Sequence, residues 1–360
     1  MNPERILLGH LASFGDCLLA TPIARQLKED YPGCVLTWAI GSMYRSAVDG
    51  NPFVDSIWEI PLTSRNEMDN AWRQFEVEAK RCLARGEFDH LVFTQLNPNN
   101  YQNFDGTVRA SILRGYPGRF TVPITPVLRL RDEEIANVRQ FAEHHGIIGR
   151  KHVILFECAS RSGQSFLTPS YAMEVAHAVL DRVVDCCLIL SSNEKIDTRR
   201  PGVVDGSILS LRENAELSKY CTLLVGCSSG ISWLCTSDWA KKLPTIQVLK
   251  RSTSVYASMA HDAEYFGLPA GHIIEMTDCT VQRLGDCICA ALAEPFASAR
   301  DRFHEQIPVE LTMYLETFMR SMLRSGQVLK ALKSLSLVRK RYGFDPFLRY
   351  MKTKFTEPQD

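Results

Sequence analysis

Short apolar runs alternate along this chain with longer segments in which apolar residues recur at helical spacing. The first run, residues 5–8, predicts a buried strand, and a loop with a glycine at each end follows it. From Asp16 an apolar residue recurs every four positions, which predicts a helix that Pro32 ends. Pro22 falls within this pattern, where proline is tolerated only near a helix start. A strand, a loop and a helix start in this order direct free backbone N–H groups toward a ligand.

The same alternation continues to about residue 250 and predicts an α/β fold. Further strands are expected at residues 35–40, 54–60, 90–94, 152–156, 186–190, 208–209, 223–226 and 245–249. Helices are expected at residues 42–48, 66–85, 131–145, 169–182, 214–220 and from residue 231. Residues 118–126 are expected to carry the first sheet to its edge. Strands that alternate with helices form βαβ units around a parallel sheet.

The pattern restarts after residues 146–151, a plausible linker, and so predicts two α/β halves of similar size. We expect two Rossmann-like domains that face each other across a cleft. The first would span residues 1–146. The second would span residues 151–295.

Residues 297–360 have a different character, that of a basic helical extension. Two apolar stripes separated near Gly326 predict two helices, marked by Leu311, Leu315, Phe318 and Met322 and then by Leu329, Leu332, Leu335 and Val338. Between Arg320 and Lys354 there are ten Lys or Arg residues and one acidic residue. A basic amphipathic pair either lies on an anionic membrane surface or packs on the second domain with its charges in solvent.

The composition narrows the classes of protein. The 360 residues are 45% apolar, as in a folded globular protein, and Lys+Arg and Asp+Glu both number 41, so no overall charge favours nucleic acid. No run of about 18 apolar residues and no signal peptide is present, so we expect a cytoplasmic protein. The twelve cysteines are scattered through apolar runs, as buried reduced thiols are, and their spacing fits no zinc site. No metal is expected.

About sixty N-terminal residues carry a longer pattern of motifs. They read ILLGHLASFGDCLLATPIARQLKEDYPG and then LTWAIGSMYRSAVDGNPFVDSIWEI. This order of a Gly-Asp loop, a Thr-Pro step, Tyr-Pro, Thr-Trp and Asn-Pro-X-Val-Asp resembles the N-terminal domain of glycosyltransferase family 9, the heptosyltransferase-like enzymes. The resemblance implies a GT-B fold, with the acceptor bound mainly by the first domain and the nucleotide-sugar mainly by the second. It also implies inverting sugar transfer from a nucleotide-diphosphate sugar, with no obligatory metal or other cofactor.

Asp16 has two interpretations. From the residues alone it is either the cap of a helix or a carboxylate that faces a ligand. The resemblance implies that Asp16 is the catalytic base, which takes the proton of the acceptor hydroxyl as that hydroxyl attacks the anomeric carbon.

The resemblance to the family is weaker in the second half. Gln164 stands where the family has a lysine that contacts the donor phosphate, so Arg161 would carry more of that task. The family's Asp-Thr-Gly, with a histidine three residues on, is replaced here by Ser228, Ser229, Gly230 and Trp233, which puts ADP-heptose as the donor in doubt. Serines and a glycine before a helix still suit a phosphate, although they are also an ordinary helix cap. The residues expected to bind the donor are Ser160, Arg161, Gln164, Glu194, Arg212, Glu213, Ser228, Ser229 and Gly230.

Polar residues near the first and fourth strands are candidates for the acceptor site. They are His10, Gly15, Asn99, Asn100, Tyr101 and Arg109. The asparagine-rich loop is equally an ordinary turn, and His10 is equally a structural histidine.

These observations favour an inverting glycosyltransferase that acts on a bacterial surface glycan or glycolipid, as in lipopolysaccharide biosynthesis. Its partners would be a nucleotide-sugar and that acceptor, with peripheral contact to the inner face of the cytoplasmic membrane if the basic extension lies there. The alternatives are a sugar-nucleotide epimerase of the same shape and a binding-only homologue. A dinucleotide oxidoreductase is disfavoured because no G-x-G-x-x-G follows either first strand.

Overall fold

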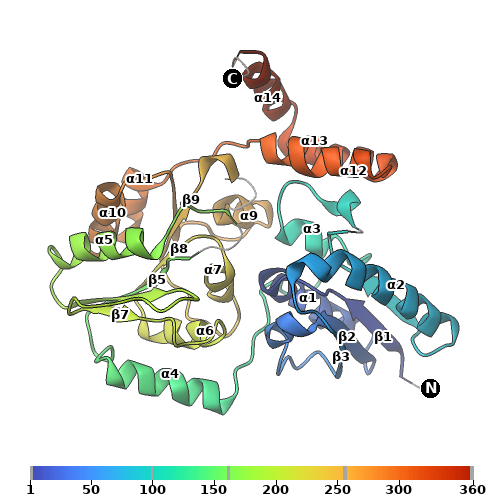
Figure 1. Cartoon of the computed structure of the whole chain (residues 1–360), viewed down its shortest axis with the longest axis horizontal. Helices are drawn as coiled ribbons and strands as arrows, with labels where there is room; N and C mark the ends of the chain where they lie inside the picture. Colours follow the sequence, from blue (N-terminus) through green and yellow to red (C-terminus); the bar gives the residue numbers. More distant parts are fainter. Residues whose placement is uncertain (1–2, 99, 160–162, 254–257, 357–360) are drawn as a thin grey trace. The chain divides into compact units, whose positions relative to one another are not determined.

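The computed structural model describes residues 3–98, 100–159, 163–253 and 258–356 and divides the chain into two compact α/β units (Figure 1). The first unit combines Met1–Arg129 with Glu310–Asp360, and the second comprises Leu130–Val309. The predicted α/β class is therefore confirmed in both halves of the chain.

A parallel four-stranded sheet in the order β3-β2-β1-β4 forms the centre of the first unit. Its strands are β1 (Arg5–Gly9), β2 (Val35–Gly41), β3 (Ser56–Ile60) and β4 (His90–Phe93). The helical elements are α1 (Phe14–Asp30), η1 (Ser42–Ala47), η2 (Arg65–Glu67), α2 (Met68–Ala84), η3 (Tyr101–Asn103) and α3 (Arg109–Leu113). Helix α2 covers one face of the sheet with buried Trp72 and Phe75, which meet Phe93 of β4 edge to face.

Helix α1 differs from the prediction because it begins at Phe14 and runs through Pro22 without ending. A proline has no N–H to bond the carbonyl one turn earlier, here that of Leu18. The hydroxyl of Thr21 donates to the Leu18 oxygen at 2.6 Å and so satisfies it. The same hydroxyl accepts the N–H of Val127 at 2.7 Å, which ties the helix to the end of the first unit.

The prediction that residues 118–126 extend the first sheet was wrong, since they form no strand. Their backbone bonds instead to a buried side chain of α1, because the amide oxygen of Gln26 accepts the N–H groups of Thr121 and Val122 at 2.8 and 3.2 Å.

The second unit contains a parallel six-stranded sheet in the order β10-β9-β8-β5-β6-β7. Its strands are β5 (His152–Glu157), β6 (Cys186–Ser191), β7 (Val203–Asp205), β8 (Leu223–Gly226), β9 (Thr245–Leu249) and β10 (Ile273–Thr277). Its helical elements are α4 (Asp132–His144), α5 (Pro169–Leu180), α6 (Glu213–Leu217), η4 (Ser218–Tyr220), α7 (Gly230–Leu234), η5 (Arg251–Thr253), α9 (Met259–Tyr265), α10 (Val281–Ala293) and α11 (Phe296–Phe303). The strand expected at residues 208–209 lies instead at β7, and Ile208 is 69% exposed.

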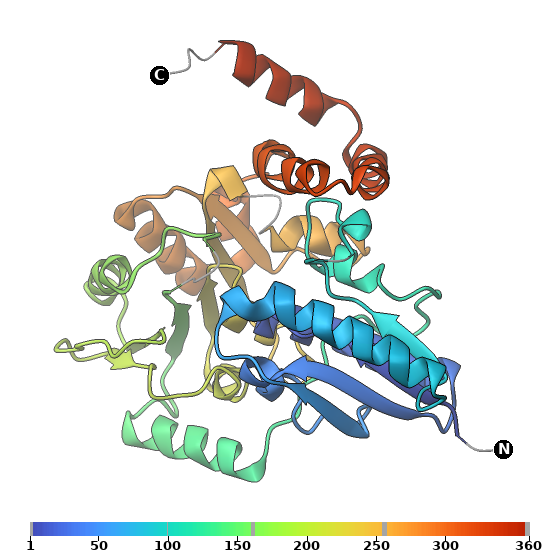
Figure 2. The same cartoon turned by 45° about the vertical axis from the view of Figure 1, so that its right-hand side comes forward.

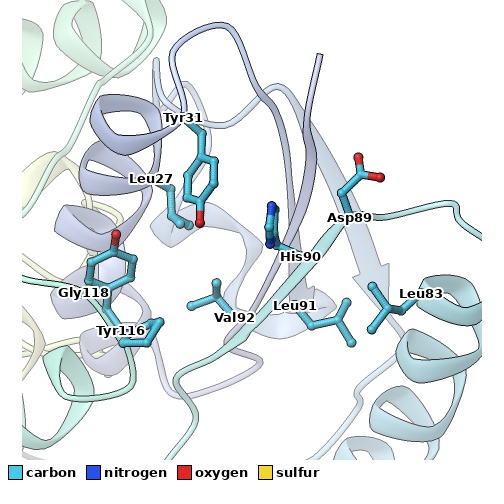
Figure 3. Close-up of a pocket in the computed structure, with 10 residues that line it drawn as sticks. Leu27, Tyr31, Leu83, Asp89, His90, Leu91, Val92, Tyr116 and Gly118 are labelled. Atoms are coloured by element: carbon cyan, nitrogen blue, oxygen red, sulfur yellow. The ribbon is translucent and has the colours of Figure 1, made fainter. Parts of the chain in front are cut away.

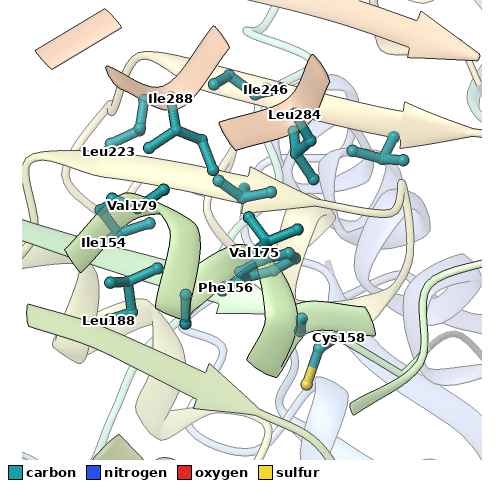
Figure 4. Packing of buried hydrophobic residues seen from close by; sticks show 14 of the residues in the cluster. Ile154, Phe156, Cys158, Val175, Val179, Leu188, Leu223, Ile246, Leu284 and Ile288 are labelled. Carbon is teal, nitrogen blue, oxygen red and sulfur yellow. The ribbon is translucent and has the colours of Figure 1, made fainter. Parts of the chain in front are cut away.

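One face of this sheet packs on α5 and α10, and this layer forms a large apolar core (Figure 4). Ile154, Leu188 and Ile246 point from the strands toward Val175 of α5 and Leu284 of α10. Cys158, Cys186 and Cys287 belong to the same core, and all twelve cysteines of the chain are buried and free. Their burial explains why they fill apolar runs.

Helix α4 belongs to the second unit, so the first domain is shorter than the expected residues 1–146. Phe141 and Val138 of α4 pack with Leu155 of β5 and Leu217 of α6 in one buried cluster. The contacts thus place the boundary before this helix, whereas the sequence indicated a boundary after it.

The C-terminal extension folds as η6 (Tyr314–Met319), α12 (Arg320–Arg324), α13 (Val328–Tyr342) and α14 (Asp345–Thr356) (Figure 2). These residues, from Glu310 onward, belong to the first unit, which corrects the interpretation that placed the extension on the second domain, whereas residues 297–309 of the expected extension stay with the second unit. Ser334 donates to the Phe104 carbonyl at 2.7 Å, and Arg341 pairs with the buried Asp105 at 2.8 Å. Burial raises the pKa of Asp105. The positive charges of Arg114 and Arg341 lower it by more than burial raises it, so the pKa lies below its usual value.

Candidate functional site

In the first unit, Asp16 lies in the first turn of α1, just after the loop that follows β1. Its carboxylate accepts the N–H of Ser13, the N-cap residue, at 3.4 Å, so Asp16 does contribute to the helix cap. The side chain is nevertheless only partly buried. The capping interpretation and the catalytic one are therefore compatible.

Burial raises the pKa of Asp16 to about 6, while the hydrogen bonds from Ser13 and the charge of Arg65 keep it from rising further. Such a carboxylate is ionised at neutral pH and is a stronger base than an ordinary aspartate. A general base works best when its pKa lies near the working pH. Asp16 thus has the protonation behaviour that a proton acceptor needs.

Arg65 and Tyr44 interact electrostatically with Asp16. Neither was among the predicted site residues. Burial raises the pKa values of both Asp16 and Tyr44, and the charge of Arg65 offsets part of each rise. Arg65 opens η2, which follows β3, and Tyr44 lies in η1, which follows β2. The carboxyl ends of parallel strands meet at one edge of a sheet. The position of Arg65 and Tyr44 just after two strands was therefore the signal in the sequence that they lie near Asp16.

A buried glutamine at the end of β4 holds the loop before Asp16 in place. The side-chain oxygen of Gln95 accepts the N–H groups of Leu11 and Ala12 at 2.9 and 3.0 Å, and its amide donates to the Ala12 carbonyl at 2.7 Å. One side chain thus satisfies three backbone groups of this loop. The sequence contained no local sign of this contact, because the partners are more than eighty residues apart.

We expect Gln95→Leu to lower the free energy of unfolding by about 2–4 kcal/mol, because two buried N–H groups and a carbonyl lose their partner. Urea unfolding followed by circular dichroism measures the change. The same substitution at the exposed Gln140 of α4 is the control and should have almost no effect. Equal stability of both variants would show that Gln95 does not hold the loop.

His10 is buried, and its Nδ1 lies 2.8 Å from the hydroxyl of Thr94. Burial lowers the pKa of His10 to about 3, so the imidazole is neutral at physiological pH. Within the described part of the chain its Nε2 has no hydrogen-bond partner. His10 therefore provides no positive charge for a phosphate, and a role in binding the acceptor stays a prediction.

The other acceptor candidates also lie in the first unit, apart from Asn99, which lies outside the described residues. The amide of Asn100 donates to the carbonyls of Phe93 and Gln95 at 2.9 Å each, so this residue closes a turn. Tyr101 begins η3, and Arg109 is buried at the start of α3. A side chain at Gly15 would meet no atom within 4 Å, so the space beside this glycine is open.

In the second unit, the two residues with the strongest predicted phosphate contacts, Ser160 and Arg161, lie outside the described residues. Gln164 is buried, and its carbonyl accepts the N–H of Lys250 at 2.9 Å, which joins the loop after β5 to the end of β9. Glu194 is exposed in the loop that follows β6.

Side chains of the protein itself accept the N–H groups at the start of α7. The expectation that these N–H groups are free to bind a phosphate is therefore wrong. The buried carboxylate of Glu157, the last residue of β5, accepts the N–H groups of Ile231 and Ser232 at 2.9 and 3.1 Å. The N–H of Ser228 donates to the side chain of Gln247 at 2.6 Å. A carboxylate thus takes the position of the expected anion. An acidic residue at the end of an apolar strand was the signal that the sequence analysis missed.

Of the three residues expected in this loop, Ser228 is buried and adopts a left-handed backbone with φ of 52°. Ser229 and Gly230 are partly exposed. Hydroxyl contact with a ligand is therefore open to Ser229 rather than to Ser228.

Arg212 and Glu213 join α6 to α4, whereas the sequence placed them beside the nucleotide. The guanidinium of Arg212 makes two bonds to the carboxylate of Glu134, at 2.7 and 3.1 Å, and both side chains are buried. Glu213 accepts the N–H of Ser210 at 2.6 Å and the amide of Asn137 at 3.2 Å. Both residues therefore have structural partners within the second unit.

A pocket of about 490 Å³ opens in the first unit between β4, the end of α1 and residues 116–118 (Figure 3). Tyr31 and His90 face each other across it, with ring centres 4.9 Å apart. It lies at the start of β4, away from Asp16, and none of the predicted site residues lines it.

Neither a metal site nor a membrane span is found in the described ranges, residues 3–98, 100–159, 163–253 and 258–356. They contain no group of three or more His, Cys, Asp or Glu residues placed to hold a metal ion. None of their helices combines the length and the apolar character needed to cross a bilayer.

Sequence comparison finds neither a matching protein-family model nor a matching curated protein. Comparison of structures finds a glycosyl transferase family 9 protein from Veillonella parvula DSM 2008, with a TM-score of 0.56 and 16% identity over 80% of this chain and 89% of that one. The E. coli ADP-heptose lps heptosyltransferase II aligns with a TM-score of 0.53 and 13% identity over 80% of this chain and 98% of that one. The chain therefore has the GT-B glycosyltransferase fold of these two proteins.

Proposed function

We propose that this protein is an inverting glycosyltransferase that moves a sugar from a nucleotide-diphosphate sugar to a hydroxyl of a bacterial surface glycan or glycolipid. The observation that carries the proposal is Asp16, a partly buried carboxylate with a pKa raised to about 6 in the first turn of α1, just after the loop that follows the first strand. The GT-B fold of the chain supports it.

In the proposed reaction Asp16 accepts the proton of the acceptor hydroxyl while the hydroxyl oxygen forms a bond to the anomeric carbon. The bond from that carbon to the diphosphate breaks at the same time, and the nucleoside diphosphate leaves with its electron pair. Attack from the side opposite the leaving group inverts the configuration. The hydrogen bonds from Ser13 and, to a smaller extent, the positive charge of Arg65 favour the ionised form of Asp16.

For the donor we propose the loop after β5, with Ser160, Arg161 and Gln164, together with Ser229, Gly230 and Glu194. Arg212, Glu213 and Ser228 would act only indirectly, by holding the backbone around α6 and α7. No metal is assigned a role. We place the protein in the cytoplasm, at the inner face of the membrane where glycolipid acceptors are built.

A panel of nucleotides tests the proposal. We expect one nucleoside diphosphate, and the sugar nucleotides with the same base, to stabilise the protein by about 2.7 kcal/mol at a hundredfold excess over Kd. The rise of several degrees in Tm is measured by thermal unfolding, with inorganic diphosphate as the control.

Two results would contradict the proposal, and each would favour another function. Stabilisation by no nucleotide at all would favour a binding-only homologue. Conversion of a nucleotide-sugar in the absence of any acceptor would favour an epimerase.

A further inference from the structure

Helix α14 carries a row of exposed apolar side chains along one face. Phe344, which immediately precedes the helix, Leu348 and Met351 are 58%, 61% and 49% exposed. Their spacing of four and three residues places them one above another on the same face. Large apolar residues that are exposed singly need no explanation, but a continuous row does.

The row stays largely exposed, although the ring of Phe344 contacts the guanidinium of Arg339 on α13. Helix α14 is attached through another side, where Tyr350 donates to Glu316 at 3.1 Å and Lys354 pairs with Glu316 at 2.6 Å. Figure 2 shows α14 as the outermost helix of the first unit, beyond α12 and α13.

Helix α13 repeats the arrangement. It packs on the first unit through Ala331, Ser334 and Val338, which are all buried. Of the four residues predicted to form its apolar stripe, Val338 is buried, but Leu329 and Leu332 are 76% and 57% exposed. The N-terminal half of the stripe is therefore left uncovered by the fold.

Positive charge surrounds these apolar side chains. Lys333 and Lys340 are exposed on α13, and the guanidinium of Arg339 lies 4.4 Å from the ring centre of Phe344, which joins the two helices. The segment 320–354 holds ten Lys or Arg residues against one acidic residue, and two of these cations are paired with carboxylates outside it, Arg341 with Asp105 and Lys354 with Glu316. Lys333, Arg339 and Lys340 are the cations that lie among the exposed apolar side chains.

We propose that this basic apolar face, defined as Leu329, Leu332, Phe344, Leu348 and Met351 with Lys333, Arg339 and Lys340, docks on the surface of an anionic lipid bilayer. The apolar side chains would enter the boundary between headgroups and acyl chains, and the cations would lie among anionic headgroups. The helices lie on the membrane and do not cross it. This inference goes beyond the proposed sugar transfer and does not depend on it.

A second copy of the chain is a poorer occupant of this face. Pairing two such faces would bring the three cations of one face against the three of the other. Juxtaposed like charges oppose association. An anionic bilayer complements both the charge and the apolar row.

Vesicle flotation of the full-length protein, without nucleotide or acceptor, tests the proposal separately from the enzymatic one. We expect the protein to float with vesicles of phosphatidylcholine and phosphatidylglycerol, and to bind pure phosphatidylcholine at least tenfold less well. Binding should weaken as salt is raised, because the electrostatic part is screened.

Two variants separate the contributions. Phe344→Ser/Leu348→Ser/Met351→Ser should lower the partition coefficient at least tenfold through lost apolar burial. Lys333→Gln/Lys340→Gln should lower it on the order of tenfold on anionic vesicles only. Val77→Ser and Val184→Ser, at side chains 51% and 88% exposed elsewhere, are the matched controls and should float like the wild type.

Circular dichroism and size-exclusion chromatography of each variant complete the experiment, and exposed positions should leave folding intact. Three results would overturn the proposal: wild type that stays with the soluble fraction, a triple variant that floats like the wild type, or a dimer that the triple variant dissociates while no vesicle binding occurs.

Discussion

Asp16→Asn is expected to lower the turnover of the proposed transfer by about a thousandfold while nucleotide affinity changes by no more than a few-fold. A positioned general base contributes roughly two to four orders of magnitude, and an amide cannot accept the proton. The nearly identical shape of asparagine keeps the helix start filled. Turnover is measured with the nucleotide-sugar that the thermal panel identifies.

A matched control separates catalysis from helix capping. Asp132→Asn removes an exposed carboxylate from the first turn of α4 and should leave turnover unchanged. Turnover of Asp16→Asn within a few-fold of the wild type would remove Asp16 from the mechanism.

The same variant has a stability signature with a defined sign. The pKa of Asp16 is raised from 3.8 to about 6 in the folded protein, so the folded state holds this proton more tightly than the unfolded state. Wild-type stability therefore falls as the pH rises from about 4 to 6, and the full cost, about 3 kcal/mol at most, remains above that. Asparagine does not titrate, so Asp16→Asn does not show this pH-dependent loss of stability.

Relative to the wild type, the free energy of unfolding of Asp16→Asn should thus rise between pH 4 and 6 and then stay constant. Urea unfolding at several pH values measures the difference. A difference that does not change with pH would mean that the carboxylate is not held in its raised-pKa environment.

Arg212→Met is expected to lower the free energy of unfolding by about 3–5 kcal/mol, because the buried carboxylate of Glu134 loses its buried ion-pair partner and keeps only the contacts from Arg131. The double variant Arg212→Met/Glu134→Leu should regain most of the loss, since two apolar side chains can replace a buried ion pair. Urea unfolding of the single and double variants gives the coupling between the two positions.

Nucleotide affinity decides between the structural role of Arg212 and the donor-binding role that the sequence suggested. If Arg212 holds α6 on α4, the double variant binds nucleotide as the wild type does. A large loss of affinity with little loss of stability would instead restore Arg212 to the donor site. Arg139→Met, on the exposed side of α4, is the control for removing an arginine.

Much of the fold could be predicted because its strands are apolar runs in a regular alternation. The strands β1, β2, β4, β5, β6, β8 and β9 lie within a residue or two of their predicted positions. Two of the failures have one cause, a side chain that replaced a backbone partner. Gln26 takes the N–H groups that a strand at residues 118–126 would have used, and the hydroxyl of Thr21 allows Pro22 inside a helix.

The candidate site also has one part that the sequence indicated and one part that it did not. Asp16 was recognisable because its position depends on a strand and a helix that are adjacent in sequence. The partners of Arg212 and of the α7 N–H groups were not recognisable, since Glu134 and Glu157 lie more than seventy residues away along the chain. In the sequence alone, an isolated acidic residue such as Glu134 or Glu157 is equally consistent with a ligand site and with a structural contact.

By itself the sequence determined the α/β class, the loop that carries Asp16 and the basic character of the last helices, because each depends on local spacing and composition. Only the tertiary structure decided which polar groups are already satisfied. It assigned Glu157 to the start of α7, Glu134 to Arg212, and the extension to the first unit through Phe104 and Asp105. Burial makes an unpaired polar group costly, so the partner that packing brings near decides its role, and local sequence does not specify that partner.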